Sequence, residues 1–235
     1  YPYTFGSTSL FSLLPPSILA LSRLEQRLAL SLENEREEIR REILHPSGWD
    51  SIYSMVGPDD IKAIYLDDGK EYAGLTLSEI GKRRGQDPLE ALFDILADET
   101  GLAVMEDVTE SEENLVRIMT HPLMCFGSDS LYSSPHPHTR SRHAAVEFLS
   151  EYVIKRGLMP LASGIRKLSG EASDRLSFCD RGYVREGYKA DLVLFRPEAL
   201  AVEEEGNKGL EYVLVNGVLA MDKGRLTGSL SGSVI

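Results

Sequence analysis

The sequence predicts an α/β protein, and three patterns support that prediction. Apolar residues recur at helical spacing over residues 23–44 and again over 142–156. A wholly apolar run at residues 123–127 (LMCFG) is typical of a strand buried on both faces, as in a parallel sheet. Strand patterns dominate after residue 180, so we place a domain boundary there, between an α/β part and a β-rich part.

The first hundred residues are expected to be mainly helical. Residues 1–8 predict a short strand that breaks into a loop at Gly6 and Ser7. The helix over 23–44 ends at His45-Pro46, and short strands are expected at 49–56 and 61–66. The apolar stripe of that helix comprises Leu24, Leu28, Leu32, Ile39 and Ile43.

Asp87 begins the clearest helix of the chain. Asp87 suits the N-cap, Pro88 the first turn and Glu90 the third helical position. Its expected buried residues are Leu89, Leu92, Phe93 and Leu96. Further helices are expected from Ser111-Glu112, and over residues 142–156, 160–169 and 171–176.

Strands are expected at LVLF, residues 192–195, and at residues 212–215 and 218–221. The last two flank Asn216-Gly217, the strongest short signal for a β-hairpin. Asp222-Lys223-Gly224 predicts another turn.

The charge balance excludes some partners. Acidic residues outnumber basic ones by 37 to 25, and a net charge of −12 repels phosphate backbones, so we expect no nucleic-acid partner.

No apolar run approaches the ~20 residues that cross a bilayer, so no membrane partner is expected. Two cysteines are too few for a disulfide framework, which favours a cytoplasmic protein. Without an initiating Met or a signal peptide, Tyr1 is interpreted as lying within a longer polypeptide.

Asp129 is the first candidate for chemistry. It follows the expected strand at 123–127, and catalytic groups of a βα barrel stand at the carboxyl ends of strands. A carboxylate there can ligate a metal and accept a proton from an attacking water. It could equally cap the following turn or helix.

Arg140 and the histidines before it are further candidates. A guanidinium can hold a substrate carboxylate through two parallel hydrogen bonds, although Arg140 could also be a surface residue. His136 and His138 have a spacing used by metal sites, but Pro137 and the loop setting favour a structural role. His143 is expected to be solvated and Cys125 to be an inert core residue.

Several segments resemble the amidohydrolase superfamily and, within it, the N-acyl-D-amino-acid deacylases (D-aminoacylases). They include YPYTFGST at 1–8, GSD at 127–129, HPHTR at 136–140, GIRKLSGEASDRL at 164–176, DRGYVREGYKADLVLF at 180–195 and YVLVNGVLAMDKGRLTG at 212–228. The last two are typical of the superfamily. The combination of the first motif, GSD and the downstream arginine is similar to the D-aminoacylases.

The resemblance implies a partial TIM-like (β/α)8 barrel with a C-terminal share of a small β-sandwich. Residues 1–179 would be the C-terminal part of the barrel, with strands at 1–4 and 123–127 and a helical insertion at about 9–120. Residues 180–235 would belong to the sandwich. Because two strands cannot close an eight-stranded barrel, the upstream half of the enzyme is expected to exist.

The resemblance also implies the site. Asp129 would contact zinc and act as general base, Arg140 would bind the α-carboxylate of an N-acyl amino acid, and Tyr1 and Ser7 would help orient that carboxylate. The other zinc ligands would lie upstream of this chain. Ser130 stands where relatives often have Gly, and Ser-Arg-His-Ala-Ala replaces the usual Gly-Thr-Phe after Arg140.

Three functions follow as hypotheses. The first is a zinc-dependent hydrolase of N-acyl-D-amino acids. The second is a cyclic amidase of the same superfamily, similar to dihydroorotases and hydantoinases. The third is a non-catalytic remnant that lacks the metal-binding half.

Overall fold

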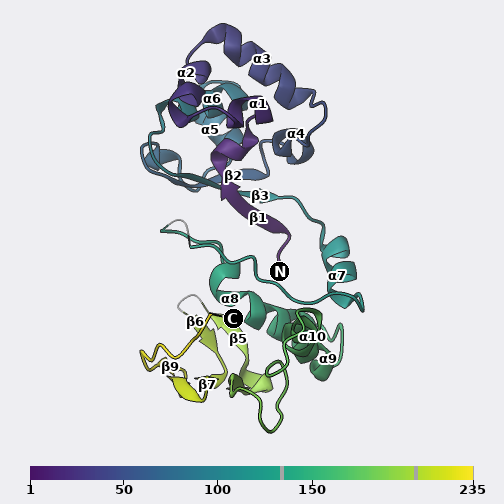
Figure 1. Ribbon diagram of the computed structural model, residues 1–235. Helices are drawn as coiled ribbons and strands as arrows, with labels where there is room; N and C mark the ends of the chain where they lie inside the picture. The colour runs from purple at the N-terminus through teal and green to yellow at the C-terminus, as the bar shows by residue number, and fades with distance from the viewer. Residues whose placement is uncertain (133–134, 204–205, 235) are drawn as a thin grey trace. The chain divides into compact units, whose positions relative to one another are not determined.

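The computed structural model describes residues 1–132, 135–203 and 206–234 (Figure 1). The chain divides into two compact units. The N-terminal unit comprises Tyr3–Glu112 and Tyr132–His138. The C-terminal unit comprises Tyr1–Pro2, Glu113–Leu131 and Thr139–Ile235.

The N-terminal unit is built on a three-stranded antiparallel sheet. Its strands are β1 (Phe5–Ser9), β2 (Ile61–Leu66) and β3 (Ala103–Val108), and β3 lies between the other two. Residues 61–66 form a strand as predicted, whereas β3 was not predicted. The opening strand is shifted: residues 1–4 are outside it, and Gly6 lies within it opposite Asp107. Pairing with β3 therefore overrides the loop signal at Gly6 and Ser7.

Short helices pack with this sheet around one apolar core. The core joins Ile61, Ala63 and Met105 of the sheet to helical residues such as Phe93 and Ile43. The helices are η1 (Leu10–Leu13), α1 (Pro16–Leu19), α2 (Arg23–Leu30), α3 (Glu33–Leu44), α4 (Ile52–Val56), η2 (Lys70–Tyr72), α5 (Leu77–Arg84) and α6 (Pro88–Asp98).

Helix α6 begins as its sequence predicts. The Asp87 carboxylate accepts hydrogen bonds from the backbone N–H groups of Leu89 and Glu90, at 3.0 and 3.4 Å. The four residues predicted to be buried, Leu89, Leu92, Phe93 and Leu96, are all in the core. A local cap and a helical stripe were sufficient to predict this element.

The single helix expected over 23–44 is wrong, because the chain turns at Ser31-Leu32 and forms α2 and α3. Ile39 and Ile43 are buried as predicted. Leu24, Leu28 and Leu32 are instead 65%, 56% and 52% exposed. The turn changes which face of the first helix meets the core, so that Gln26 and Leu30 are its buried residues.

The strand expected at 49–56 is also wrong, since residues 52–56 form helix α4. The hydroxyl of Ser51 accepts a hydrogen bond from the backbone N–H of Ser54 at 3.3 Å. This N-cap stabilises a helical turn. In such a short apolar stretch, strand propensity alone does not distinguish a helix from a strand.

The helices of the C-terminal unit follow the predicted order. They are α7 (Glu112–Thr120), α8 (Arg140–Glu147), the π-helical segment η3 (Phe148–Lys155), α9 (Leu161–Leu168) and α10 (Gly170–Arg175). Val146, Leu149, Tyr152 and Val153, which lie in the helix predicted over residues 142–156, are buried. Gly157, with φ +64°, comes directly after residue 156, where this helix was predicted to end.

The strands of the C-terminal unit form two antiparallel sheets. One has the order β4 (Leu192–Phe195), β7 (Leu210–Val215), β8 (Val218–Asp222) and β9 (Arg225–Leu226). The other pairs β5 (Ala201–Glu203) with β6 (Gly206–Lys208), after η4 (Pro197–Ala199). The predicted hairpin is confirmed, with φ +48° at Asn216 and +78° at Gly217 between β7 and β8.

The expected strand at residues 123–127 is not formed. The segment is largely exposed, and Cys125, expected in the core, is exposed with it. A strand buried on both faces needs paired neighbours, and no described strand pairs with this segment. The described residues therefore form a mixed α/β arrangement without a closed barrel. Of the helices described, none is long and apolar enough to cross a membrane.

Candidate functional site

Two residues predicted to act in catalysis and binding form an ion pair in the C-terminal unit. Asp129 Oδ2 lies 3.0 Å from Arg140 Nη2. The arginine side chain is 5% exposed, whereas the aspartate side chain is 64% exposed. In the structure, the guanidinium that was predicted to bind a substrate carboxylate contacts the carboxylate of Asp129.

The backbone of Asp129 has an uncommon conformation. Its φ is +52°, in the left-handed region, which Asp tolerates better than most residues. The next helix begins only at Arg140, with Thr139 as its N-cap, so Asp129 is not the cap of a following helix. The carboxylate instead contacts the first residue of α8.

Ser141 connects the loop after Asp129 to α8. Its hydroxyl donates a hydrogen bond to the carbonyl of Leu131 at 2.8 Å and accepts one from the N–H of Leu131 at 3.2 Å. The hydroxyl of Ser130 donates to the carbonyl of Ser141 at 3.1 Å. Ser130 and the residue after Arg140, where the sequence departs from the D-aminoacylase pattern, are thus in contact with each other.

The other two predicted site residues lie in different units. The Tyr1 ring centroid is 4.6 Å from Arg140 Cζ, a distance suited to a cation–π interaction. Ser7 lies in β1 of the N-terminal unit, directly opposite Glu106. The C-terminal unit therefore contains Tyr1, Asp129 and Arg140 as one cluster, whereas Ser7 belongs to the N-terminal unit.

Asn207, which the sequence did not indicate, holds the first turn of α8. Its side chain donates to the carbonyl of Arg142 at 3.2 Å and accepts from Nδ1 of His143 at 2.9 Å. His143 is 8% exposed, so the expectation that it is solvated is wrong. A polar partner on β6, distant in sequence, makes its burial possible.

Lys167 of α9 was also missed. It is 6% exposed, and its ammonium donates hydrogen bonds to the carbonyls of His121 and Met124, at 2.7 and 3.1 Å. The carbonyl of Lys167 accepts from the N–H of Phe126 at 3.0 Å. A lysine near a helix end gives no sequence signal of such contacts, because they depend on a segment over forty residues away.

His136 and His138 lie among aromatic rings of the N-terminal unit. Nε2 of His138 donates to the carbonyl of Phe5 at 3.1 Å, and the His138 ring centroid is 5.3 Å from that of Tyr3 and 4.6 Å from that of Phe5. The His136 ring is 5.9 Å from that of Tyr65. These contacts agree with a structural role for His136 and His138, the role that the sequence favours over metal binding.

The residues that the structure describes do not make a zinc site by themselves. Zinc usually takes three or more protein ligands. Within residues 1–132, 135–203 and 206–234, no group of three or more His, Cys, Asp or Glu side chains could hold a metal ion. Asp129 remains the single candidate ligand from the sequence analysis.

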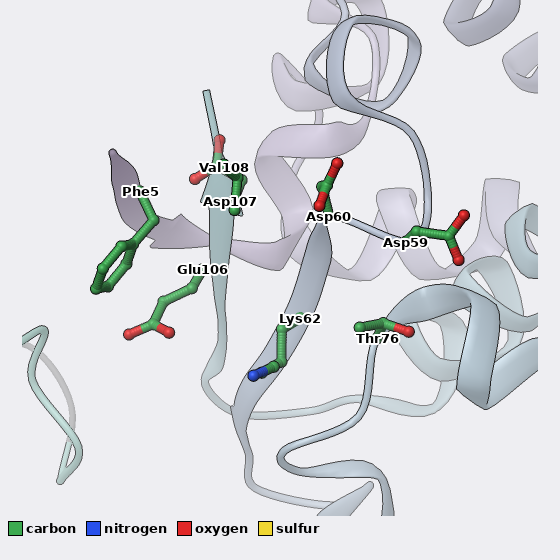
Figure 2. Close-up of a pocket in the computed structure, with 8 residues that line it drawn as sticks. All are labelled: Phe5, Asp59, Asp60, Lys62, Thr76, Glu106, Asp107 and Val108. Carbon is green, nitrogen blue, oxygen red and sulfur yellow. The ribbon is translucent and has the colours of Figure 1, made fainter. Parts of the chain in front are cut away.

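The N-terminal unit has a pocket of about 390 Å³ beside its sheet (Figure 2). Phe5, Lys62, Glu106 and Val108 line it from the three strands; the other lining residues are Asp59, Asp60, Thr76 and Asp107. Partial burial, together with the negative charge of Asp107, raises the pKa of Glu106, while Lys62 acts in the opposite direction. The pocket is thus predominantly acidic.

Comparison with known proteins identifies similar chains. The model of the amidohydrolase family matches residues 64–221. The N-acyl-D-aspartate deacylase of Alcaligenes xylosoxydans xylosoxydans is 32% identical over 171 residues, covering 70% of this chain and 33% of that enzyme. The chain spans about a third of the length of the curated relatives it matches.

Solved structures agree at the level of the fold. A crystal structure of D-aminoacylase has a TM-score of 0.68 at 24% identity, covering 99% of this chain and 41% of that one. The N-acyl-D-glutamate deacylase of Bordetella bronchiseptica, complexed with zinc and a phosphonate mimic of the tetrahedral intermediate, has a TM-score of 0.65 at 24% identity, covering 96% and 40%.

Proposed function

The chain belongs to the amidohydrolase family, and from that premise we propose that it is part of a hydrolase that cleaves the amide bond of N-acyl-D-amino acids. The products would be a carboxylate and a D-amino acid. The similarity to an N-acyl-D-aspartate deacylase supports this substrate class. The structural observation that carries the proposal is the contact between Asp129 and Arg140.

Arg140 would bind the α-carboxylate of the substrate. Its guanidinium is buried, and charge-assisted hydrogen bonds to a carboxylate are stronger where water is excluded. With five N–H donors, it can bind a substrate carboxylate beside or in place of Asp129. A local cation is also needed because the net charge of −12 opposes the approach of an anion. Tyr1, whose ring faces Arg140, would restrict the guanidinium to one orientation.

Asp129 would transfer the proton. Hydrolysis adds water to the acyl carbon, breaks the C–N bond and moves one proton from that water to the leaving nitrogen. A carboxylate next to the site that binds the substrate can accept this proton and then donate it to the amine. Ser7 would help to orient the α-carboxylate of the substrate, as the family resemblance implies.

Zinc belongs to the proposal as the metal of the complete enzyme, supported by the zinc-containing structure of a related deacylase. The described residues of this chain hold no group of three or more His, Cys, Asp or Glu side chains that could bind a metal, so the ligands other than Asp129 would have to come from other parts of the polypeptide.

The test is hydrolysis by the natural polypeptide, measured as released amino acid. We expect turnover of N-acetyl-D-methionine or N-acetyl-D-aspartate, and little turnover of the matching L-enantiomers. Dialysis against a chelator should abolish the activity, and added zinc should restore it. Turnover of a cyclic imide in place of these amides would support the cyclic-amidase alternative, and no turnover of any amide would reject the proposal.

A further inference from the structure

We propose that Lys167 is the positioning residue for Asp129. It holds the segment of residues 121–126 that leads into Gly127, Ser128 and Asp129. This inference rests on the proposed function, because it assigns Lys167 a role in placing the proton-transfer group. All of the contacts that support it lie within the C-terminal unit.

The first support is the number of backbone groups that Lys167 satisfies. Residues 121–126 pair with no described strand, so their N–H and C=O groups need other partners. The ammonium of Lys167 donates to the carbonyls of His121 and Met124, and its own carbonyl accepts from the N–H of Phe126. One residue thus makes three hydrogen bonds with the backbone of this segment.

The second support is the burial of the charge. Lysine is almost never fully buried unless its ammonium is satisfied, because desolvation of an ammonium is costly. Lys167 is nevertheless 6% exposed, and its ammonium donates to two backbone carbonyls of this one segment. These two hydrogen bonds therefore hold residues 121–126 against the Lys167 side chain of α9.

The third support is the short chain path to Asp129. Only Gly127 and Ser128 separate Phe126 from Asp129, and Cβ atoms added at Gly127 would meet nothing within 4 Å. The path through Asp129 is therefore held at Phe126 on one side, and on the other by the ion pair of Asp129 with Arg140 and the contacts of Ser130 and Leu131 with Ser141. Arg175 adds one hydrogen bond to the carbonyl of Leu123, in the middle of the segment.

The test compares Lys167→Met, which keeps the aliphatic chain but removes the charge and donors, with Lys167→Arg, which keeps both. Lys155→Met is the matched control, since that side chain is 75% exposed and pairs with Glu151, which lies one turn away in the same helical segment. Three quantities are measured on the natural polypeptide: kcat and KM for N-acetyl-D-amino acids, and the rate of amide hydrogen exchange of residues 121–131.

We expect Lys167→Met to lower kcat by about 10-fold to 100-fold, because small displacements of a reacting group have effects of this size. KM should change less than about two-fold, because Arg140 belongs to α8 and remains in place. Exchange at Phe126 should become faster. Lys167→Arg should recover most of kcat, and Lys155→Met should behave like the unaltered protein.

Unchanged exchange over residues 121–131 in Lys167→Met would overturn the inference, as would an equal loss of kcat in Lys155→Met. A loss of activity that only follows the fraction of unfolded protein would also overturn it. If the unaltered protein hydrolyses no amide, the proposed function fails, and the exchange measurement still decides whether Lys167 holds the segment.

Discussion

Asp129 Oδ2 and Arg140 Nη2 lie 3.0 Å apart, and the two side chains differ sharply in exposure. The buried guanidinium of Arg140, the first residue of α8, faces the exposed carboxylate of Asp129. A substrate carboxylate that binds Arg140 would therefore share the guanidinium with Asp129 or exchange with it. Removal of either charge should change binding and turnover in different ways.

Arg140→Ala should raise KM for an N-acyl-D-amino acid by about 10-fold to 100-fold, because a hydrogen bond to a charged group contributes about 1.5–3 kcal/mol. The value of kcat should fall less. The measurement is steady-state kinetics, with circular dichroism to verify folding. Arg41→Ala is the control, since that side chain is 67% exposed on α3. An unchanged KM would remove Arg140 from carboxylate binding.

Asp129→Asn should lower kcat by about 10²–10⁴-fold, the usual contribution of a general acid–base group. KM should stay the same or fall, because the uncharged side chain of the variant no longer competes with the substrate carboxylate for Arg140. Kinetics at saturating substrate give kcat directly. Near-normal turnover would show that another group transfers the proton.

Ile43→Ala should destabilise the N-terminal unit by about 2–5 kcal/mol, because it removes methyl groups from a fully buried site. Leu28→Ala should change the free energy of unfolding by less than about 0.5 kcal/mol, because Leu28 is 56% exposed. Urea denaturation followed by the fluorescence of Trp49, the single tryptophan, which packs against this core, measures both. Equal losses would show that Leu28 is buried after all.

Glu106→Gln should stabilise the N-terminal unit at pH 7 but not at pH 3.5. Partial burial raises the pKa of Glu106 above its ordinary value of 4.5, so the native state holds this proton more tightly than the unfolded state. The free energy of unfolding therefore falls as the pH rises from 4.5 through the raised pKa, and the loss persists above it. Gln carries no such charge.

The measurement is the midpoint of thermal unfolding, followed by Trp49 fluorescence at both pH values. The difference between the Gln variant and the unaltered protein should be larger at pH 7. A difference of the same size at pH 3.5 would mean that the side-chain shape, and not the ionisation of Glu106, is responsible.

The sequence by itself determined the elements whose signals are local. The Asp87 cap and its apolar stripe specify α6, and Asn216-Gly217 specifies the hairpin of β7 and β8, because each depends on residues within one or two turns. The candidate residues Asp129 and Arg140 also followed from the sequence, through position and resemblance, and the structure brings these two side chains together.

Only the tertiary structure decided the features that depend on distant partners. The apolar run at 123–127 is not a strand, since no described strand pairs with it; instead Lys167 donates to the carbonyl of Met124 and accepts from the N–H of Phe126. His143 is buried because Asn207 provides a polar partner from β6. Burial and strand pairing are properties of the surroundings, so residue type and spacing along the chain do not specify them.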